Sequence, residues 1–164
     1  MEKNPEISIV IPLFNENESL KELIETTQNV MDIHNYDYEI IFIDDGSTDK
    51  SWISIKEISK KYKNIFGVSF SKNYGKSQAL HAGFEKAKGN FIFTLDADLQ
   101  DSPHEIPLMY EILLNENLDL ISGWKKKRFD SFFFKNMPSK LFNWAARKVS
   151  GIKIHDFNCG IKGY

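Results

Sequence analysis

Two aspartates, Asp96 and Asp98, stand one residue apart, directly after an apolar segment of the chain. Carboxylates at this spacing can hold a hard divalent cation, because Mg²⁺ and Mn²⁺ prefer oxygen ligands and often share them with substrate phosphates. Gln100 and Asp101 follow closely and offer further oxygen atoms. The alternative is an Asp-x-Asp turn that only caps a strand or helix. The position of the pair in the fold decides between the two.

A second acidic segment covers residues 44–49, with the sequence Asp-Asp-Gly-Ser-Thr-Asp. Glycine allows the backbone to turn sharply there, and a carboxylate beside it can accept hydrogen bonds from a base or a ribose. An ordinary turn that leads into a helix would have the same composition. This segment alone therefore predicts a turn, and a nucleotide contact only together with other motifs.

The segment 72–77 contains Gly75-Lys76-Ser77, which invites comparison with a phosphate-binding P-loop. A P-loop also needs a glycine five residues before Gly75, and Phe70 occupies that position, so the motif fails. Lys76 still stands where a helix is expected to begin, and a helix start can receive a phosphate. A solvated lysine is the alternative.

The charges of the chain are divided unevenly. Residues 1–123 contain 11 Lys and Arg against 21 Asp and Glu, whereas residues 124–164 contain 10 against 2. The basic segment 125–128 is followed by aromatic residues at 129 and 132–134 and by Lys135. Cations interleaved with aromatics suit a phosphate headgroup at a bilayer surface. A solvated loop followed by a helix with core aromatics is the alternative, and the charge alone would also suit a nucleic acid.

The elements that must position these residues alternate between strand and helix. Apolar, β-branched runs predict strands at 7–13, 38–43, 65–70, 91–95 and 118–121, with helices at about 16–32, 48–62, 75–88 and from 102 onward. Beyond residue 123 the alternation stops, and a helix is expected at about 132–150. Strands that are apolar throughout are typical of a sheet covered on both faces. The pattern predicts an α/β fold with a mostly parallel, doubly wound sheet and helices on both faces.

In such a sheet, ligands bind outside the carboxyl ends of the strands. Those ends carry residues 15–16, 44–45, 71–73 and 96–98, so polar and acidic side chains are expected to meet at one edge. The 164 residues suffice for one domain, and the single cysteine, Cys159, excludes an intrachain disulfide. No apolar run approaches the roughly 20 residues of a membrane-spanning helix.

Three segments taken together resemble a known family. Residues 9–16, 43–49 and 95–100 are similar in sequence and order to family-2 inverting glycosyltransferases, most of all to the polyprenyl-phosphate sugar transferases. The resemblance implies a Rossmann-like GT-A fold and transfer of a sugar, with inversion, from a UDP- or GDP-sugar. It implies Mg²⁺ or Mn²⁺ as cofactor. The expected acceptor is a polyprenyl phosphate, and a saccharide hydroxyl is the alternative.

The resemblance also assigns roles to residues. The nucleotide would contact Pro12, Phe14, Glu16, Ile43, Asp45 and Ala97, and the metal would be bound by Asp96, Asp98 and Gln100. Lys76, through its position at the expected helix start, is added as a candidate phosphate contact. The acceptor phosphate would meet Lys125 and Lys135, with Arg128 nearby, and Asp156 would line the acceptor side. A phosphate acceptor needs no base, whereas a hydroxyl acceptor would need Asp156 or Asp98 to take its proton.

On this interpretation the whole chain is one catalytic domain, with the donor and metal part at 1–123 and the acceptor part at 124–164. Members of the family continue with interfacial and often membrane-spanning helices, so further segments are expected after Tyr164. The expected location is the cytoplasm at the inner face of the cell membrane, with homo-oligomers left open and no nucleic-acid partner. Two other classes remain: a haloacid-dehalogenase-like phosphatase, and a non-catalytic nucleotide-binding or membrane-docking module.

Overall fold

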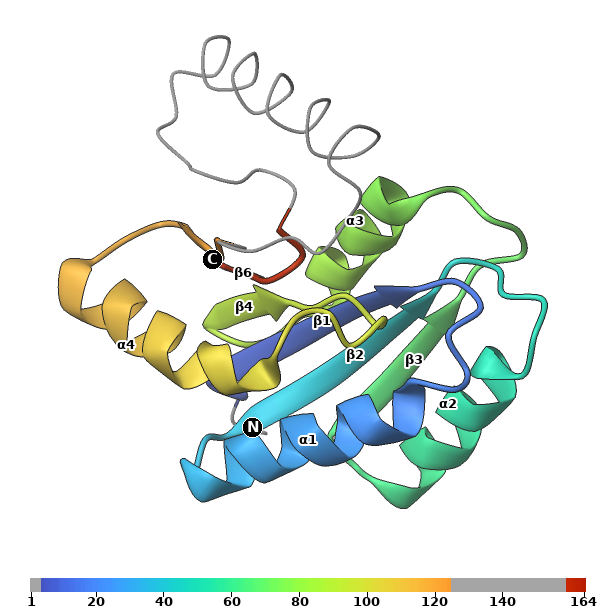
Figure 1. Cartoon of the computed structure of the whole chain (residues 1–164), viewed down its shortest axis with the longest axis horizontal. Helices are drawn as coiled ribbons and strands as arrows, with labels where there is room; N and C mark the ends of the chain where they lie inside the picture. Colours follow the sequence, from blue (N-terminus) through green and yellow to red (C-terminus); the bar gives the residue numbers. More distant parts are fainter. Residues whose placement is uncertain (1–3, 125–158) are drawn as a thin grey trace, which may run out of the picture.

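The computed structural model describes residues 4–124 and 159–164, and these form a sheet covered by helices (Figure 1). The predicted helix at 132–150, the acceptor residues Lys125, Arg128 and Lys135, and Asp156 lie outside the described residues. Every other element predicted from the sequence falls within them.

Six strands form one sheet in the order β3-β2-β1-β4-β6-β5. The strands are β1 (Ile7–Leu13), β2 (Tyr38–Asp44), β3 (Ile65–Ser69), β4 (Phe91–Thr94), β5 (Ile121–Ser122) and β6 (Lys162–Gly163). The pairs β1–β2, β2–β3 and β1–β4 are parallel, and β6 is antiparallel to both β4 and β5. The predicted mostly parallel sheet is therefore confirmed, and the order 3-2-1-4 is that of a Rossmann-like half.

Helices cover both faces of the sheet, as the apolar strands predict. The larger core lies between one face and helices α1 (Leu20–Ile33), α2 (Ser51–Lys61) and α4 (Ile106–Glu116). The smaller core joins Val10, Ile41 and Ile43 on the opposite face to Ala79 of α3 (Lys76–Lys86). Because β1 and β2 are buried along their whole length, their exits toward α1 and α2 are held firmly in place.

Two parts of the sheet differ from the sequence prediction. The fifth strand was expected at 118–121, but β5 is Ile121–Ser122. The reason is the end of α4, where Asn117 adopts a left-handed conformation and the Leu118 N–H donates to the Leu113 carbonyl. Leu118 thus closes the helix and does not begin the strand.

The second difference is β6, which the sequence did not predict. It brings the end of the described chain back between β4 and β5. Tyr164 extends the pairing by exchanging backbone hydrogen bonds with Ile92, and the Tyr164 ring packs edge-on against Phe84 of α3. Residues 159–164 therefore lie next to the strand that leads to Asp96.

No helix in residues 4–124 or 159–164 combines the length and the apolar character that crossing a bilayer would require.

Candidate active site

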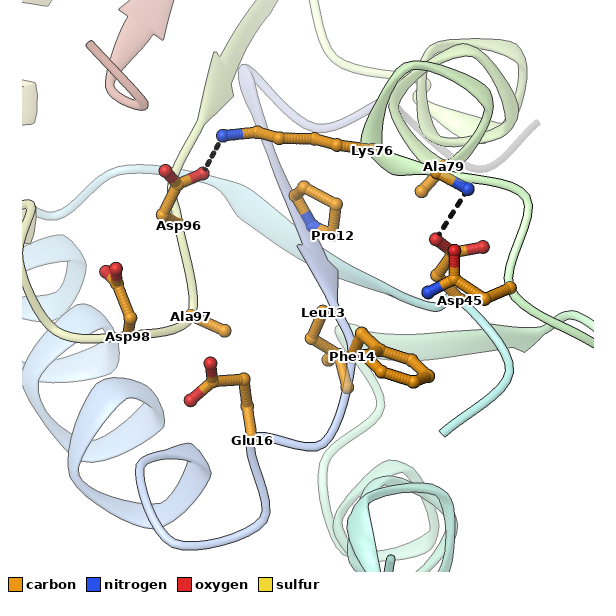
Figure 2. A pocket seen from close by; sticks show the side chains of 12 residues that line it. Pro12, Leu13, Phe14, Glu16, Asp45, Lys76, Ala79, Asp96, Ala97 and Asp98 are labelled. Carbon is orange, nitrogen blue, oxygen red and sulfur yellow. Dashed lines mark hydrogen bonds and ion pairs between the residues drawn. The ribbon is translucent and has the colours of Figure 1, made fainter. Parts of the chain in front are cut away.

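A cleft of about 350 Å³ opens at the carboxyl ends of the central strands (Figure 2). It lies where β1, β2 and β4 end and α3 begins, which is where ligands of doubly wound sheets bind. The lining residues are Pro12, Leu13, Phe14, Glu16, Asp45, Asn73, Gly75, Lys76, Ala79, Asp96, Ala97 and Asp98. In Figure 2 the carboxylates of Asp96, Asp98 and Glu16 group on one side of the cleft, and Phe14 and Asp45 lie on the other.

The turn after β1 is fastened to the loop after β2 by side-chain hydrogen bonds. Asn15 adopts a left-handed conformation with φ of 58°, which asparagine tolerates better than most residues. Its side-chain oxygen accepts from the Thr48 N–H at 2.8 Å, and its own N–H donates to Ser47 Oγ at 2.9 Å. The Glu16 N–H donates to Ser51 Oγ at 3.0 Å. These contacts fix Phe14 and Glu16 on either side of the turn.

Asp49 completes this fastening. Its carboxylate accepts the Ser51 N–H at 2.8 Å and the Asn17 N–H at 3.2 Å. Burial acts to raise the pKa of Asp49, but the hydrogen bonds from Ser51 and Asn17 outweigh it and lower the pKa below its usual value. The carboxylate is thus held ionised as part of the loop and faces backbone donors.

Asp45 joins the loop after β2 to the segment before α3. One carboxylate oxygen accepts the Tyr74 N–H at 2.7 Å and the other accepts the Gly75 N–H at 2.8 Å. Gly46 makes this approach possible, since its φ is +74° and a Cβ there would lie 2.4 Å from the Lys72 carbonyl carbon. Asp45 is buried and has both oxygens engaged, so it positions the start of α3 as well as lining the cleft.

The opposite wall is the turn after β4. Asp98 Oδ1 accepts the Gln100 N–H at 3.1 Å, a local turn that orients the Asp98 side chain. Leu99 between them has φ of 60°, an uncommon conformation for leucine. Across the cleft, Lys76 Nζ forms an ion pair with Asp96 Oδ1. A backbone held in an uncommon conformation next to ionised side chains is a frequent property of functional sites.

Charge in the cleft is strongly one-sided. Four lining side chains are carboxylates, and Lys76 is the one cation among the described lining residues. An anionic ligand would be repelled unless a cation joined it. Within residues 4–124 and 159–164, no three His, Cys, Asp or Glu side chains come together closely enough to hold a metal ion. Oxygen donors of this kind fit a divalent cation such as Mg²⁺ or Mn²⁺, which Asp96 and Asp98 would hold together with oxygen atoms from a ligand or from water.

The structure brings together most of the site residues named from the sequence. Those that line the cleft are Pro12, Phe14, Glu16, Asp45, Lys76, Asp96, Ala97 and Asp98. Ile43 does not, because it is fully buried under α3, where it packs in one cluster with the cleft residue Ala79. The Gln100 side chain is exposed outside the lining, and only its N–H reaches Asp98. The roles of these residues toward a ligand remain predictions.

Four lining residues were not assigned a role from the sequence: Leu13, Asn73, Gly75 and Ala79. Asn73 and Gly75 follow β3, and their place after a strand was the available signal. Leu13 and Ala79 carry no such signal, since in sequence they are ordinary apolar residues of a strand and a helix.

Comparison with protein families decides the assignment. The model of the family described as glycosyl transferase family 2 matches residues 8–164. The chain belongs to glycosyl transferase family 2. This membership sets aside the phosphatase alternative. The matched residues include all those that line the cleft.

Curated relatives refine this family. The chain is 36% identical over 160 residues to a dodecaprenyl-phosphate galacturonate synthase of Rhizobium johnstonii, covering 97% of this chain and 47% of that protein. It is 38% identical over 159 residues to an undecaprenyl-phosphate 4-deoxy-4-formamido-L-arabinose transferase of Aeromonas hydrophila, covering 96% and 48%. The chain thus spans about half the length of the curated relatives that it matches.

Solved structures show that the fold is GT-A. A glucosyl-3-phosphoglycerate synthase of Mycobacterium tuberculosis, in complex with Mn²⁺, UDP and phosphoglyceric acid, matches with a TM-score of 0.72 and 21% identity over 97% of this chain and 55% of that one. A mannosyltransferase of Pyrobaculum calidifontis, in complex with GDP-mannose and Mn²⁺, matches with a TM-score of 0.69 and 17% identity over 99% and 45%.

Proposed function

We propose that this glycosyltransferase binds a nucleotide sugar in the cleft and transfers the sugar, with inversion, to a polyprenyl phosphate. The proposal rests on the acidic cleft, which is lined by four carboxylates and by the start of α3. An anion with its own divalent cation fits such a site, and a nucleoside diphosphate is an anion of this kind. The two curated relatives are named for polyprenyl-phosphate chemistry.

The donor would lie across the cleft between its two walls. The ring of Phe14, which is 43% exposed, offers a stacking surface for a base on the side of Asp45. The diphosphate would extend toward Asp96 and Asp98, where Lys76 and the first N–H groups of α3 meet its charge. This arrangement does not distinguish UDP from GDP.

A divalent cation at Asp96 and Asp98 would neutralise the charge that grows on the leaving diphosphate. Both solved relatives named above contain Mn²⁺, which supports a divalent cation without deciding between Mn²⁺ and Mg²⁺. This chain contributes two carboxylates and the turn at Leu99 that orients Asp98. Gln100 is a predicted third ligand, and its side chain would have to turn inward to take part.

The reaction joins an acceptor oxygen to the anomeric carbon as the bond from that carbon to the diphosphate breaks. The nucleoside diphosphate leaves with the electron pair, and attack from the opposite face inverts the carbon. A phosphate acceptor is already ionised, so no proton has to be moved. A saccharide hydroxyl would release a proton, and Asp98 in the cleft or Asp156 outside the described residues is the carboxylate that we expect to accept it.

The acceptor side of the proposal depends on Lys125, Arg128, Lys135 and Asp156, which lie outside the described residues. These cations are expected to meet the lipid phosphate at the inner face of the cell membrane. Lysine at 125 and 135 offers a point charge and no bidentate grip, so affinity there would come from charge more than from geometry. The proposal leaves open whether the chain forms homo-oligomers.

A thermal-shift panel with UDP, GDP and CDP, each with and without Mn²⁺, tests the donor part. A ligand that binds only the folded state stabilises it by mass action, so one nucleotide is expected to raise the Tm by about 5 °C or more with Mn²⁺ present. Labelled nucleotide sugars and vesicles containing undecaprenyl phosphate then test transfer. A chain that shifts with no nucleotide under either condition would reject the proposal.

A further inference from the structure

Gly160 lies directly against two carboxylates at the edge of the cleft. A Cβ atom on Gly160 would lie 2.4 Å from Asp96 Oδ2 and 2.2 Å from Asp101 Oδ2. Non-bonded atoms do not approach this closely, so a side chain at Gly160 must displace both carboxylates unless the Gly160 backbone itself moves. Positive φ angles occur among the described glycines at Gly46 and Gly75. The requirement at Gly160 is therefore one of space and not of backbone conformation.

The Gly160 backbone has little freedom to withdraw. Its carbonyl accepts a buried hydrogen bond of 2.7 Å from Thr94 Oγ1, and Thr94 is the last residue of β4. Two residues later the chain enters β6, which pairs with β4 through Lys162 and Gly163. The strand that leads to Asp96 and the segment that carries Gly160 are thus held together by the Thr94 hydrogen bond and by the β4–β6 pairing.

The two carboxylates differ in how deeply they are buried and therefore in how easily they can move. Asp101 is buried, with 4% of its surface exposed, and its carboxylate fills one side of the space next to Gly160. The Asp96 side chain is 27% exposed and borders the open cleft. A side chain at Gly160 would overlap both carboxylates, and the more exposed Asp96 has the open cleft into which it can be pushed away from its present orientation.

We propose that Gly160 is a positioning residue for Asp96, with Asp101 as the opposite wall. Its missing side chain leaves the Asp96 carboxylate the room to face the cleft. The contact also ties the metal side of the donor site to the segment that returns from the acceptor side of the chain. The inference rests on the proposed function, because it predicts that a side chain at Gly160 lowers the affinity of the proposed site for a divalent cation.

The test is Gly160→Ala in the 164-residue chain, with Mn²⁺ titrated in the presence of a saturating nucleoside diphosphate. Loss of groups that orient metal ligands typically costs 10- to 100-fold in metal affinity, so the Kd for Mn²⁺ is expected to rise at least tenfold. The matched control is Gly163→Ala, whose Cβ would lie 2.5 Å from Phe93 Cε1 and touches no carboxylate. It is expected to lower the Tm and leave the Kd unchanged.

A second pair of variants tests the same contact if Gly160→Ala does not fold. Asp101→Ala opens the space beside Asp96 and is expected to weaken Mn²⁺ binding severalfold, whereas Asp101→Asn keeps the shape and is expected to bind nearly as the unaltered chain does. Wild-type Mn²⁺ affinity in Gly160→Ala, or in Asp101→Ala where the first variant is unfolded, overturns the inference. Equal losses in Gly160→Ala and Gly163→Ala do the same. Failure of the unaltered chain to bind Mn²⁺ with any nucleotide rejects the proposed function itself.

Discussion

Lys76, at the start of α3, forms an ion pair with Asp96, which follows β4, and the pair closes one side of the cleft (Figure 2). The same Asp96 carboxylate belongs to the proposed cation site. A lysine and a divalent cation would compete for it as long as the cleft holds no phosphate. A diphosphate in the cleft would offer Lys76 a new partner and release the carboxylate.

Replacing Lys76 with methionine should separate these two effects. Without nucleotide, Lys76→Met is expected to bind Mn²⁺ severalfold more tightly, because the competing cation is gone. With nucleoside diphosphate present, the affinity for the nucleotide should fall at least about tenfold, since hydrogen bonds to charged groups contribute about 1.5–3 kcal/mol. Calorimetric titration of Mn²⁺ and of the nucleotide measures both values.

Lys72→Met is the matched control. Lys72 lies near Lys76, but its ammonium group stacks over the Tyr74 ring and it does not line the cleft. It should leave both affinities within a factor of two. Tighter nucleotide binding by Lys76→Met would contradict the exchange of partners.

Asp98→Asn tests the cation site with the smallest change of shape. The amide oxygen can still accept the Gln100 N–H, so the turn should persist and the Tm should change little. The added stability from Mn²⁺ with nucleotide should disappear, and transfer should fall by at least 100-fold. Asp119→Asn, an exposed residue after α4, serves as control for the loss of one negative charge. Normal transfer by Asp98→Asn would remove this residue from the mechanism.

Asp45→Asn should reduce stability more than a surface substitution does. An asparagine offers one acceptor oxygen for the two partly buried N–H groups of Tyr74 and Gly75, so one of these hydrogen bonds is lost. The expected loss in the free energy of unfolding is about 0.5–1.5 kcal/mol. Urea unfolding measures it. Asp119→Asn, which alters an exposed aspartate after α4, should change it by less than about 0.5 kcal/mol. A loss equal to that of Asp119→Asn would mean that Asp45 does not hold the start of α3.

The helices and strands that could be predicted from the sequence are those with a regular spacing or an unbroken run of apolar residues. The uninterrupted apolar runs of β1 and β2 identified buried parallel strands, and the parallel arrangement then placed Glu16, Asp45 and Asp96 at one edge. Contacts that depend on distant pairing could not be predicted in this way. The two-residue strand β6 has too few residues to show a period, and its place beside β4 is fixed by tertiary pairing.

The same reason explains which site details were missed. Asp45 was expected to contact a nucleotide, and sequence alone could not show that both its oxygens accept from Tyr74 and Gly75. Ile43 follows the strand pattern into the core, because alternate residues of β2 face α3. The contact of Gly160 with Asp96 joins residues 64 positions apart, and only the fold brings them together.

The environment of Tyr110 leads us to expect that the folded state loses stability at alkaline pH. It is buried in α4, its hydroxyl donates a hydrogen bond to Glu6 Oε1, and its ring packs edge-on against Phe91. Burial, followed by the hydrogen bond to Glu6 and the negative charge of Glu6, raises the pKa of Tyr110 well above its usual value. In the unfolded chain the same group titrates near 10.

The sign follows from linkage. The folded pKa is the higher one, so the contribution of Tyr110 is complete below about pH 10 and is lost as the pH rises from there toward the folded pKa. Each pH unit in this window removes up to about 1.4 kcal/mol. Tyr110→Phe keeps the ring packing and removes the ionisation, so its urea midpoint should fall less between pH 9 and pH 11. Burial also raises the pKa of Tyr36, Tyr38 and Tyr164, so some loss remains in the variant. An equally steep fall in Tyr110→Phe would assign the alkaline transition to those other groups.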